Sequence, residues 1–137
     1  MDSRIRKYCR HITRIHLEVL RKDKKTGVWY WDLPAAASVC YNKDMSKRGY
    51  SHFPNNTTWA EPLRQKIKEL GELGHGTSLC SNPLGNCAEQ HSGNKLLKAY
   101  KKIKQLEQLN FTETVRPRTM EILTPCTHCR KIFPKLK

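Results

Sequence analysis

Asn86-Cys87-Ala88-Glu89 and Pro125-Cys126-Thr127-His128-Cys129 are the two stretches that decide the fold of this chain. A Cys-X-X-Cys at the start of a helix directs two sulfurs the same way within one turn. Cys87 also precedes a helical pattern, and the positive end of a helix favours the thiolate form of a cysteine. Two loop-to-helix junctions that face each other would therefore bring three sulfurs around one metal ion.

Three thiolates bind zinc tetrahedrally and leave the fourth position to water, which is the arrangement of a catalytic zinc site. We therefore predict one zinc ion held by Cys87, Cys126 and Cys129. Glu89 lies two residues after the first ligand, where its carboxylate can reach that water without binding the metal. This position suits a general acid–base that takes a proton from water and returns it to the substrate.

The composition points to polyanionic partners. The 137 residues are enough for one domain and carry 26 Lys+Arg against 12 Asp+Glu, a formal net charge of +14. Such an excess favours nucleic acid first and an anionic membrane surface second. No apolar run approaches the ~20 residues of a membrane span. The basic segment 1–7 leads into an amphipathic pattern and shows no export signal, so we expect a cytoplasmic or nuclear protein that does not bind membranes.

The motifs Cys87-Ala88-Glu89 and Pro125-Cys126-Thr127-His128-Cys129 together resemble the zinc signature of the cytidine deaminase-like superfamily, in its branch with three cysteine ligands. The resemblance covers about residues 75–133 and includes the motif order and the helix and strand between them. It implies an α/β fold of three layers, a mixed β-sheet flanked by helices. It also implies that Glu89 is the catalytic proton shuttle and that activated water attacks C4 of cytosine, with ammonia leaving.

Two departures from that family refine the expectation. The short tail after Cys129 is more similar to the small deaminase domains of bacterial polymorphic toxins and their eukaryotic relatives. It leads us to expect a sheet edge that is missing or is covered by a partner, such as a second copy of the chain. No strand carries the asparagine and glutamate with which free-nucleoside deaminases hold ribose. With the charge, this favours cytosine in single-stranded DNA or RNA over free cytidine.

Several residues near the zinc ligands are candidates for substrate binding. Asn86, Ala88 and Pro125 adjoin the ligands, and Asn86 has an amide that suits a hydrogen bond to the base or sugar. Arg116 and Arg118 are candidates for phosphate contact, although a solvated strand edge explains them equally well. Three histidines lie nearby in sequence, His75, His91 and His128. A structural role is more common for such histidines than a catalytic one.

Three alternatives stay open. Cys80 would complete a closed four-thiolate zinc site with the other three cysteines, which would leave no water to activate. In the second alternative the chain is a deaminase whose substrate is a free nucleoside or another amino-heterocycle, and the sequence does not decide between cytosine and adenine. In the third alternative the chain binds nucleic acid through its basic faces and catalyses no reaction. As for the remaining cysteines, reduced thiols are favoured over disulfides, Cys9 is expected to be a small buried hydrophobe, and Cys40 has no assigned partner.

Hydrophobic periodicity predicts the secondary structure of the N-terminal half. Residues 4–22 have the pattern of an amphipathic helix with a basic outer face, and 22–27 read as the polar turn that ends it. Residues 28–31 are aromatic and strand-like, and 35–56 read as irregular. A second helix opens at 56–61 and ends at Gly71 or Gly74. In it Thr57 or Thr58 is the expected cap, Pro62 lies in the first turn, and Leu63, Ile67 and Leu70 form the buried stripe.

The C-terminal half is predicted from the same signals. Residues 75–86 read as a glycine- and asparagine-rich loop, and a third helix begins near Cys87. Its expected apolar face is Ala88, Leu96, Tyr100, Ile103 and Leu106 or Leu109. Its lysines are read either as a solvated face or as a nucleic-acid contact, and they are Lys95, Lys98, Lys101, Lys102 and Lys104. Residues 118–123 alternate as a strand does, and a short last helix starts at Cys126. We treat 1–137 as one domain.

Overall fold

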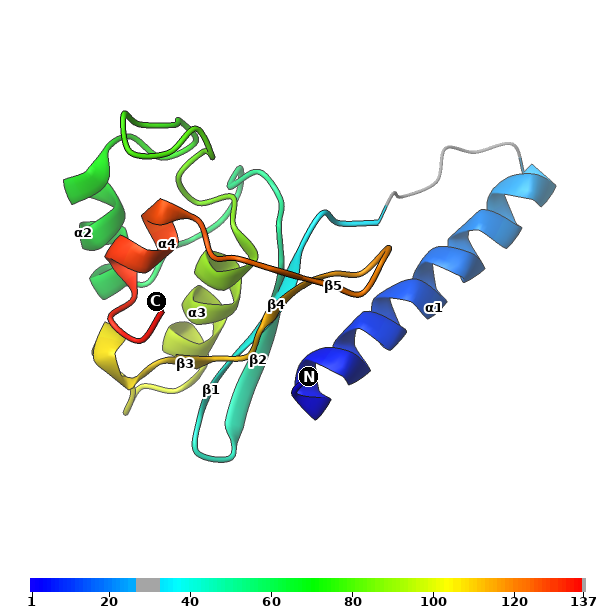
Figure 1. Cartoon of the computed structure of the whole chain (residues 1–137), viewed down its shortest axis with the longest axis horizontal. Helices are drawn as coiled ribbons and strands as arrows, with labels where there is room; N and C mark the ends of the chain where they lie inside the picture. The colour runs from blue at the N-terminus through cyan, green and yellow to red at the C-terminus, as the bar shows by residue number, and fades with distance from the viewer. Residues whose placement is uncertain (27–32, 137) are drawn as a thin grey trace.

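A five-stranded antiparallel sheet and four α-helices make up the described residues, 1–26 and 33–136, in this computed structural model; of 19–26 only the backbone is described. The helices are α1 Ser3–Thr26, α2 Glu61–Leu70, α3 Ala88–Ala99 and α4 Thr127–Ile132, with a short 3-10 turn, η1, at Leu106–Gln108. The strands are β1 Ala37–Asn42, β2 Met45–Tyr50, β3 Asn110–Phe111, β4 Thr114–Arg116 and β5 Glu121–Leu123. Figure 1 shows α1 on one side of the sheet and α2, α3 and α4 on the other.

The α/β class is confirmed, but the prediction of a mixed sheet is wrong. The strand order is β2-β1-β4-β5, with β3 also on β1, and every strand pair in the described part of the chain is antiparallel. The pairs β1–β2 and β4–β5 are hairpins, and a hairpin can only produce antiparallel neighbours. Parallel neighbours need a crossover connection, and the long segment between β2 and β3 returns antiparallel to β1 instead.

The prediction of irregular structure over 35–56 is also wrong, because this segment contains the β1–β2 hairpin. The strands pair from Ala37 opposite Tyr50 to Asn42 opposite Met45, so the turn is only two residues long. Lys43 in that turn has a φ of 55°, a conformation that short hairpin turns require. The first four residues of β1 are all buried, so the strand lacks the alternation of polar and apolar residues that sequence reasoning looks for.

The predicted N-terminal helix is confirmed, but the polar turn predicted over 22–27 is wrong, because the helix continues through that segment as far as Thr26. Ile5, Cys9 and Ile12 pack with Val39 and Val115 in a cluster on one face of the sheet. The apolar face predicted for this helix does not stay buried along its length, because Ile15 is 36% exposed. After its first three turns the helix extends past the edge of the sheet. The predicted strand at 28–31 lies outside the described residues.

The opposite face of the sheet carries a larger cluster that joins α2, α3 and α4, including Leu63, Ile67, Leu96 and Phe133. Leu63 and Ile67 are buried and Gly71 ends α2 as predicted, whereas Leu70 is only half-buried. The predicted threonine cap is wrong, since Ala60 is the N-cap and no side chain caps the helix. Pro62 in the first turn, which needs no N–H donor, starts the helix instead.

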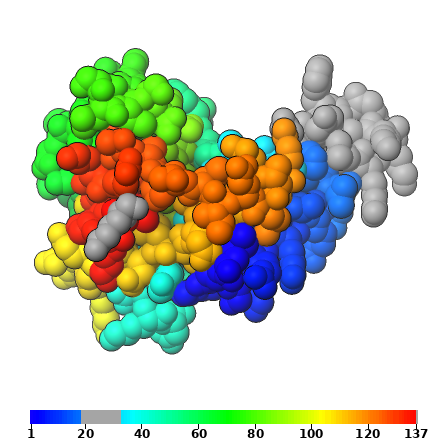
Figure 2. Space-filling view, in the orientation of Figure 1, coloured from blue at the N-terminus to red at the C-terminus, as the bar shows by residue number. Residues whose placement is uncertain are grey.

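Helix α3 starts where predicted, with Cys87 as its N-cap, but ends at Ala99. The apolar residues beyond that end remain part of the core, because Ile103, Leu106 and Leu109 turn back onto it through η1. The strand predicted over 118–123 is shortened to β5, and 117–120 form the turn from β4. Figure 2 shows this β4–β5 segment (orange) between α4 (red) and α1 (blue). Among the described helices, none is long and apolar enough to cross a membrane.

Candidate metal centre and catalytic site

The N-termini of α3 and α4 meet at a cluster of three cysteines. Cys87 is the N-cap of α3, Cys126 is the N-cap of α4, and Cys129 lies one turn into α4. Their Sγ atoms all lie within 4.8 Å of one another, with 3.3 Å between Cys87 and Cys126 and 3.5 Å between Cys126 and Cys129. The sequence prediction of which cysteines come together is therefore confirmed.

The donor set of this cluster fits a zinc ion. Thiolate sulfur is the preferred zinc ligand, and three such donors leave one of the four tetrahedral positions to another ligand. Cys80 does not join the cluster, although it is in the described part of the chain. Its backbone is held instead in a tight turn, where Thr77 N–H donates to the Cys80 carbonyl over 2.9 Å. The geometry thus gives no support to a closed four-thiolate site.

The three thiols affect one another's protonation. Hydrogen bonding with Cys129 and Cys87 holds the pKa of Cys126 well below its usual range. The proton shared with Cys126, together with burial, raises the pKa of both Cys87 and Cys129. These directions favour a single negative charge in the cluster, carried by Cys126, and a bound cation would favour the thiolate form of all three sulfurs.

Glu89 is the buried carboxyl of the site. It lies in the first turn of α3 with only 3% of its surface exposed. Burial, together with the negative charge on Cys126, raises the pKa of Glu89 to about 7. The hydroxyl of Thr114 counteracts part of that rise, and no full hydrogen bond satisfies this hydroxyl within the described part of the chain. A carboxyl with a pKa near neutrality can both accept and return a proton at physiological pH.

A cavity of about 320 Å³ lies in front of the cysteine cluster, and we call it the Glu89 cavity. Its lining residues are Ala35, Ala36, Ser51, Asn82, Asn86, Cys87, Ala88, Glu89, Thr114, Arg116, Leu123, Thr124 and Cys126. Asn86 and Ala88 thus face the space in which sequence analysis places a substrate, while Pro125 does not line it. The volume falls in the range of ~300–1,000 Å³ that is common for small-molecule sites.

Gln90 is a residue of the site that the sequence analysis missed. It is fully buried, and its Nε2 donates to Sγ of Cys129 over 3.4 Å. Its Oε1 accepts from the N–H of Gly85 over 2.6 Å, which fixes the loop that leads to Cys87. Gly85 has a φ of 87° and so needs to be glycine. The sequence shows only an amide side chain directly after the Cys-Ala-Glu motif, and its burial and its two partners are visible only in the structure.

The histidines near the motifs lie outside the Glu89 cavity. His128 points away from the sulfurs, as its position between two ligands suggests, and its Nε2 pairs with Oγ1 of Thr77 at 2.6 Å. His91 donates from Nε2 to the carbonyl of His52, and the two rings stack with 3.7 Å between centroids. His75 is exposed on the loop before the motif.

The two arginines differ in position. Arg116 lines the Glu89 cavity and donates to Oε2 of Glu121 over 2.9 Å across the β4–β5 hairpin. Arg118 is exposed in the turn of that hairpin and does not line the cavity. Only the first is therefore placed to meet a ligand in front of the cysteine cluster.

Comparison with known proteins identifies no relative of this chain. The chain matches no protein-family model, and no curated protein and no solved structure gives a significant match.

Proposed function

We propose that this protein is a zinc-dependent hydrolytic deaminase that converts cytosine to uracil, with single-stranded nucleic acid as its substrate. The observation that carries the proposal is that Glu89, a buried carboxyl, lines the same cavity as Cys87 and Cys126 of the three-cysteine cluster. A purely structural zinc site needs neither an open cavity nor a carboxyl beside it. The same constellation agrees with the zinc signature of the cytidine deaminase-like superfamily, which the two motifs resemble.

In this function Cys87, Cys126 and Cys129 hold the zinc ion, and Glu89 moves protons. Zinc, when bound, lowers the pKa of a coordinated water toward neutrality and so supplies a nucleophile. Glu89 accepts a proton from water and returns it to the base. Overall, one oxygen from water bonds to C4 of cytosine, the bond from C4 to the exocyclic nitrogen breaks, and ammonia leaves. The pKa of Glu89, raised to about 7, suits both directions of transfer.

The remaining lining residues suit recognition of a base. The Asn86 amide can donate and accept hydrogen bonds, and the buried Thr114 hydroxyl lies beside Glu89 at the same cavity. Arg116 lies at the same cavity and carries the positive charge that a phosphate or sugar edge would meet. The net charge of +14 favours a polyanionic strand over a free nucleoside as the molecule that presents the base.

Base conversion by the zinc-loaded protein tests this proposal. Single-stranded DNA, single-stranded RNA and free cytidine are offered in parallel, and Glu89→Gln is the variant because it keeps the shape and removes the titrating oxygen. Uracil formed by the wild type and absent with the variant supports the proposal, and the preferred substrate names the class. Zinc binding without conversion of any substrate overturns the catalytic role and favours either a structural zinc module or a protein that binds nucleic acid without turnover.

A further inference from the structure

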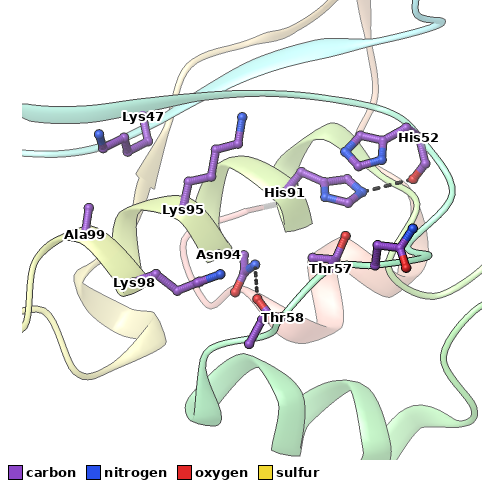
Figure 3. A pocket seen from close by; sticks show the side chains of 10 residues that line it. Lys47, His52, Thr57, Thr58, His91, Asn94, Lys95, Lys98 and Ala99 are labelled. Atoms are coloured by element: carbon purple, nitrogen blue, oxygen red, sulfur yellow. Dashed lines mark hydrogen bonds between the residues drawn. The ribbon is translucent and has the colours of Figure 1, made fainter.

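A second cavity, of about 520 Å³, lies between β2, the segment 51–58 and α3, and we call it the lysine pocket. Figure 3 shows Lys95 and Lys98 extending from α3, Lys47 from β2, and the two threonines on the facing loop. The residues that line it are Lys47, His52, Asn56, Thr57, Thr58, His91, Asn94, Lys95, Lys98 and Ala99. None of these residues is acidic, so the lining offers cations and neutral hydrogen-bonding groups only.

The three lysines of the pocket have no counter-charge. No ion pair joins Lys47, Lys95 or Lys98 to a carboxylate in the part of the chain that the structure describes. Burial lowers the pKa of Lys95, and the positive charge of Lys47 lowers it further. Cations held near one another without an anion repel, and a bound anion would remove this repulsion.

The walls of the lysine pocket are fixed by hydrogen bonds. Asn94 accepts at Oδ1 from the N–H of Ala60 over 2.7 Å and donates from Nδ2 to the carbonyl of Thr58 over 2.9 Å. His91 donates to the carbonyl of His52 over 3.0 Å. The loop 51–60 is thereby attached to α3 at both ends, and Figure 3 shows two of these bonds. Only the lysine stems need to become ordered when a ligand binds, which keeps the entropic cost small.

One chain segment separates the lysine pocket from the Glu89 cavity. Ser51 lines the Glu89 cavity, and the next residue, His52, lines the lysine pocket. His52 N–H also donates to the carbonyl of Asn86 over 3.0 Å, so the loop before the first zinc ligand is attached to the same segment. A ligand strand bound in one cavity therefore needs to pass over only this segment to enter the other.

We propose that the lysine pocket binds backbone phosphates of the single strand whose base enters the Glu89 cavity. The identity of that strand rests on the proposed function above. Three ammonium groups supply the charge, and the side chains of Asn56, Thr57 and Thr58 supply neutral donors for phosphate oxygens. These contacts are independent of base sequence, so the pocket positions the strand and leaves base selection to the Glu89 cavity.

The first test compares two variants of equal charge. In the pocket variant Lys47, Lys95 and Lys98 become Gln; in the control Lys7, Lys68 and Lys131, exposed on three other elements, become Gln. The probe is fluorescein-labelled oligodeoxycytidine of about eight nucleotides, read by anisotropy at several salt concentrations. Each phosphate neutralised on a single strand contributes ~0.7 to the salt slope, so three contacts predict a loss of roughly 100-fold at ~0.1 M salt and a slope lower by about 2. Equal weakening in both variants overturns the proposal.

The second test separates a strand from a single phosphate ester. Deoxycytidine monophosphate and inorganic phosphate are each added to the complex of the wild-type protein with the same oligonucleotide. A strand that bridges both cavities resists displacement by either compound at a hundredfold excess. Full displacement by inorganic phosphate shows that the pocket holds a free phosphate group, and full displacement by deoxycytidine monophosphate shows that a single nucleotide is enough; either result overturns the proposal.

A third measurement needs no variant. An amine-acylating reagent is applied with and without the oligonucleotide, and acylation of each lysine is read by mass spectrometry. Protection at Lys47, Lys95 and Lys98 beyond that at Lys7 and Lys131 supports the pocket, and uniform protection overturns it. None of these tests requires turnover. Failure of base conversion alone therefore refutes the proposed function, and failure of site-specific binding alone refutes the lysine pocket.

Discussion

Gln90 and Cys129 are joined by a hydrogen bond from the amide Nε2 to Sγ, 3.4 Å long and fully buried. An N–H donor directed at a sulfur stabilises the thiolate form, which is the form that binds metal. Since the other end of the same amide holds the N–H of Gly85, Gln90 connects the ligand on α4 with the loop that presents Cys87.

Gln90→Leu should therefore weaken zinc binding. Leucine has a similar volume but no donor for Cys129 and no acceptor for Gly85. Loss of such an outer hydrogen bond typically reduces metal affinity about 10–100-fold, and competition with a chromogenic chelator measures it. Gln65→Leu on the exposed face of α2 is the matched control and should leave the affinity unchanged. Equal affinities in the two variants would show that the bond to Cys129 does not support the ligand.

The four cysteines of the C-terminal half should divide into two classes on replacement by serine. Cys87→Ser, Cys126→Ser and Cys129→Ser each remove one sulfur of the cluster and should abolish stoichiometric zinc binding. Cys80→Ser should retain one zinc ion per chain, because Cys80 lies outside the cluster. Metal analysis after gel filtration decides the matter, and loss of zinc in Cys80→Ser would restore the closed four-thiolate site.

Stability should fall in mild acid because of His91. Burial lowers the pKa of this imidazole from its usual 6.5 to about 4, and the positive charges of His52 and Lys95 act in the same direction. Between these two values the unfolded chain binds the proton and the folded chain does not. The free energy of unfolding therefore decreases as the pH is lowered from 7 to 5, by about 2 kcal/mol from this residue alone.

His91→Gln isolates that contribution. Glutamine does not titrate and keeps a donor for the carbonyl of His52, so the decrease between pH 7 and pH 5 should be smaller than in the wild type. His75→Gln, at an exposed position, should leave the wild-type decrease intact. Urea unfolding at the two pH values provides the free energies. An unchanged pH dependence in His91→Gln would mean that His91 is not neutral in the folded state.

Gly49→Ala should destabilise the fold and displace the metal ligands. A Cβ at Gly49 of β2 would lie 2.8 Å from the carbonyl oxygen of Ala88 and would also clash with the backbone N of Ser92. Backbone atoms of α3 cannot rotate away as a side chain does, so the helix that begins at Cys87 has to shift. Overpacking of this kind costs about 1–3 kcal/mol. Ser46→Ala, exposed on the same strand, is the control, and a Gly49→Ala protein of wild-type stability and zinc affinity would contradict the close packing.

Much of the helical structure could be predicted from sequence, because α1, α2 and the starts of α3 and α4 depend on local signals. Apolar spacing, Pro62 and Gly71 act within a few residues of where they stand. The strands were harder. Buried Ser38 and Cys40 in β1 mask the alternation that identifies a strand, and Lys47 and Arg48 make β2 look like a loop. The antiparallel pairing of the sheet depends on contacts distant in sequence, which a single chain does not display.

The candidate site shows the same division. Cys87, Cys126, Cys129 and Glu89 could be chosen because their spacing has a chemical reason. Thr114 and Gln90 could not, since their importance comes from what the fold places opposite them. Of the lysine pocket, the sequence showed only a lysine-rich helix, whose lysines fitted a solvated face and a nucleic-acid contact equally well. Its closure by Lys47 and the loop 51–58 required the structure.

The two hydrophobic clusters on opposite faces of the sheet imply that the molecule opens in two independent steps. The side chains of α1 pack on the sheet through its first three turns, while the cysteine cluster belongs to the other face. Amide hydrogen exchange should therefore be fast beyond Thr13 in α1 and should not respond to zinc. In α3 and α4, by contrast, a bound metal should slow exchange, because it joins the starts of both helices. We therefore expect the N-terminal helix to unfold locally without disturbing the cysteine cluster on the far side of the sheet.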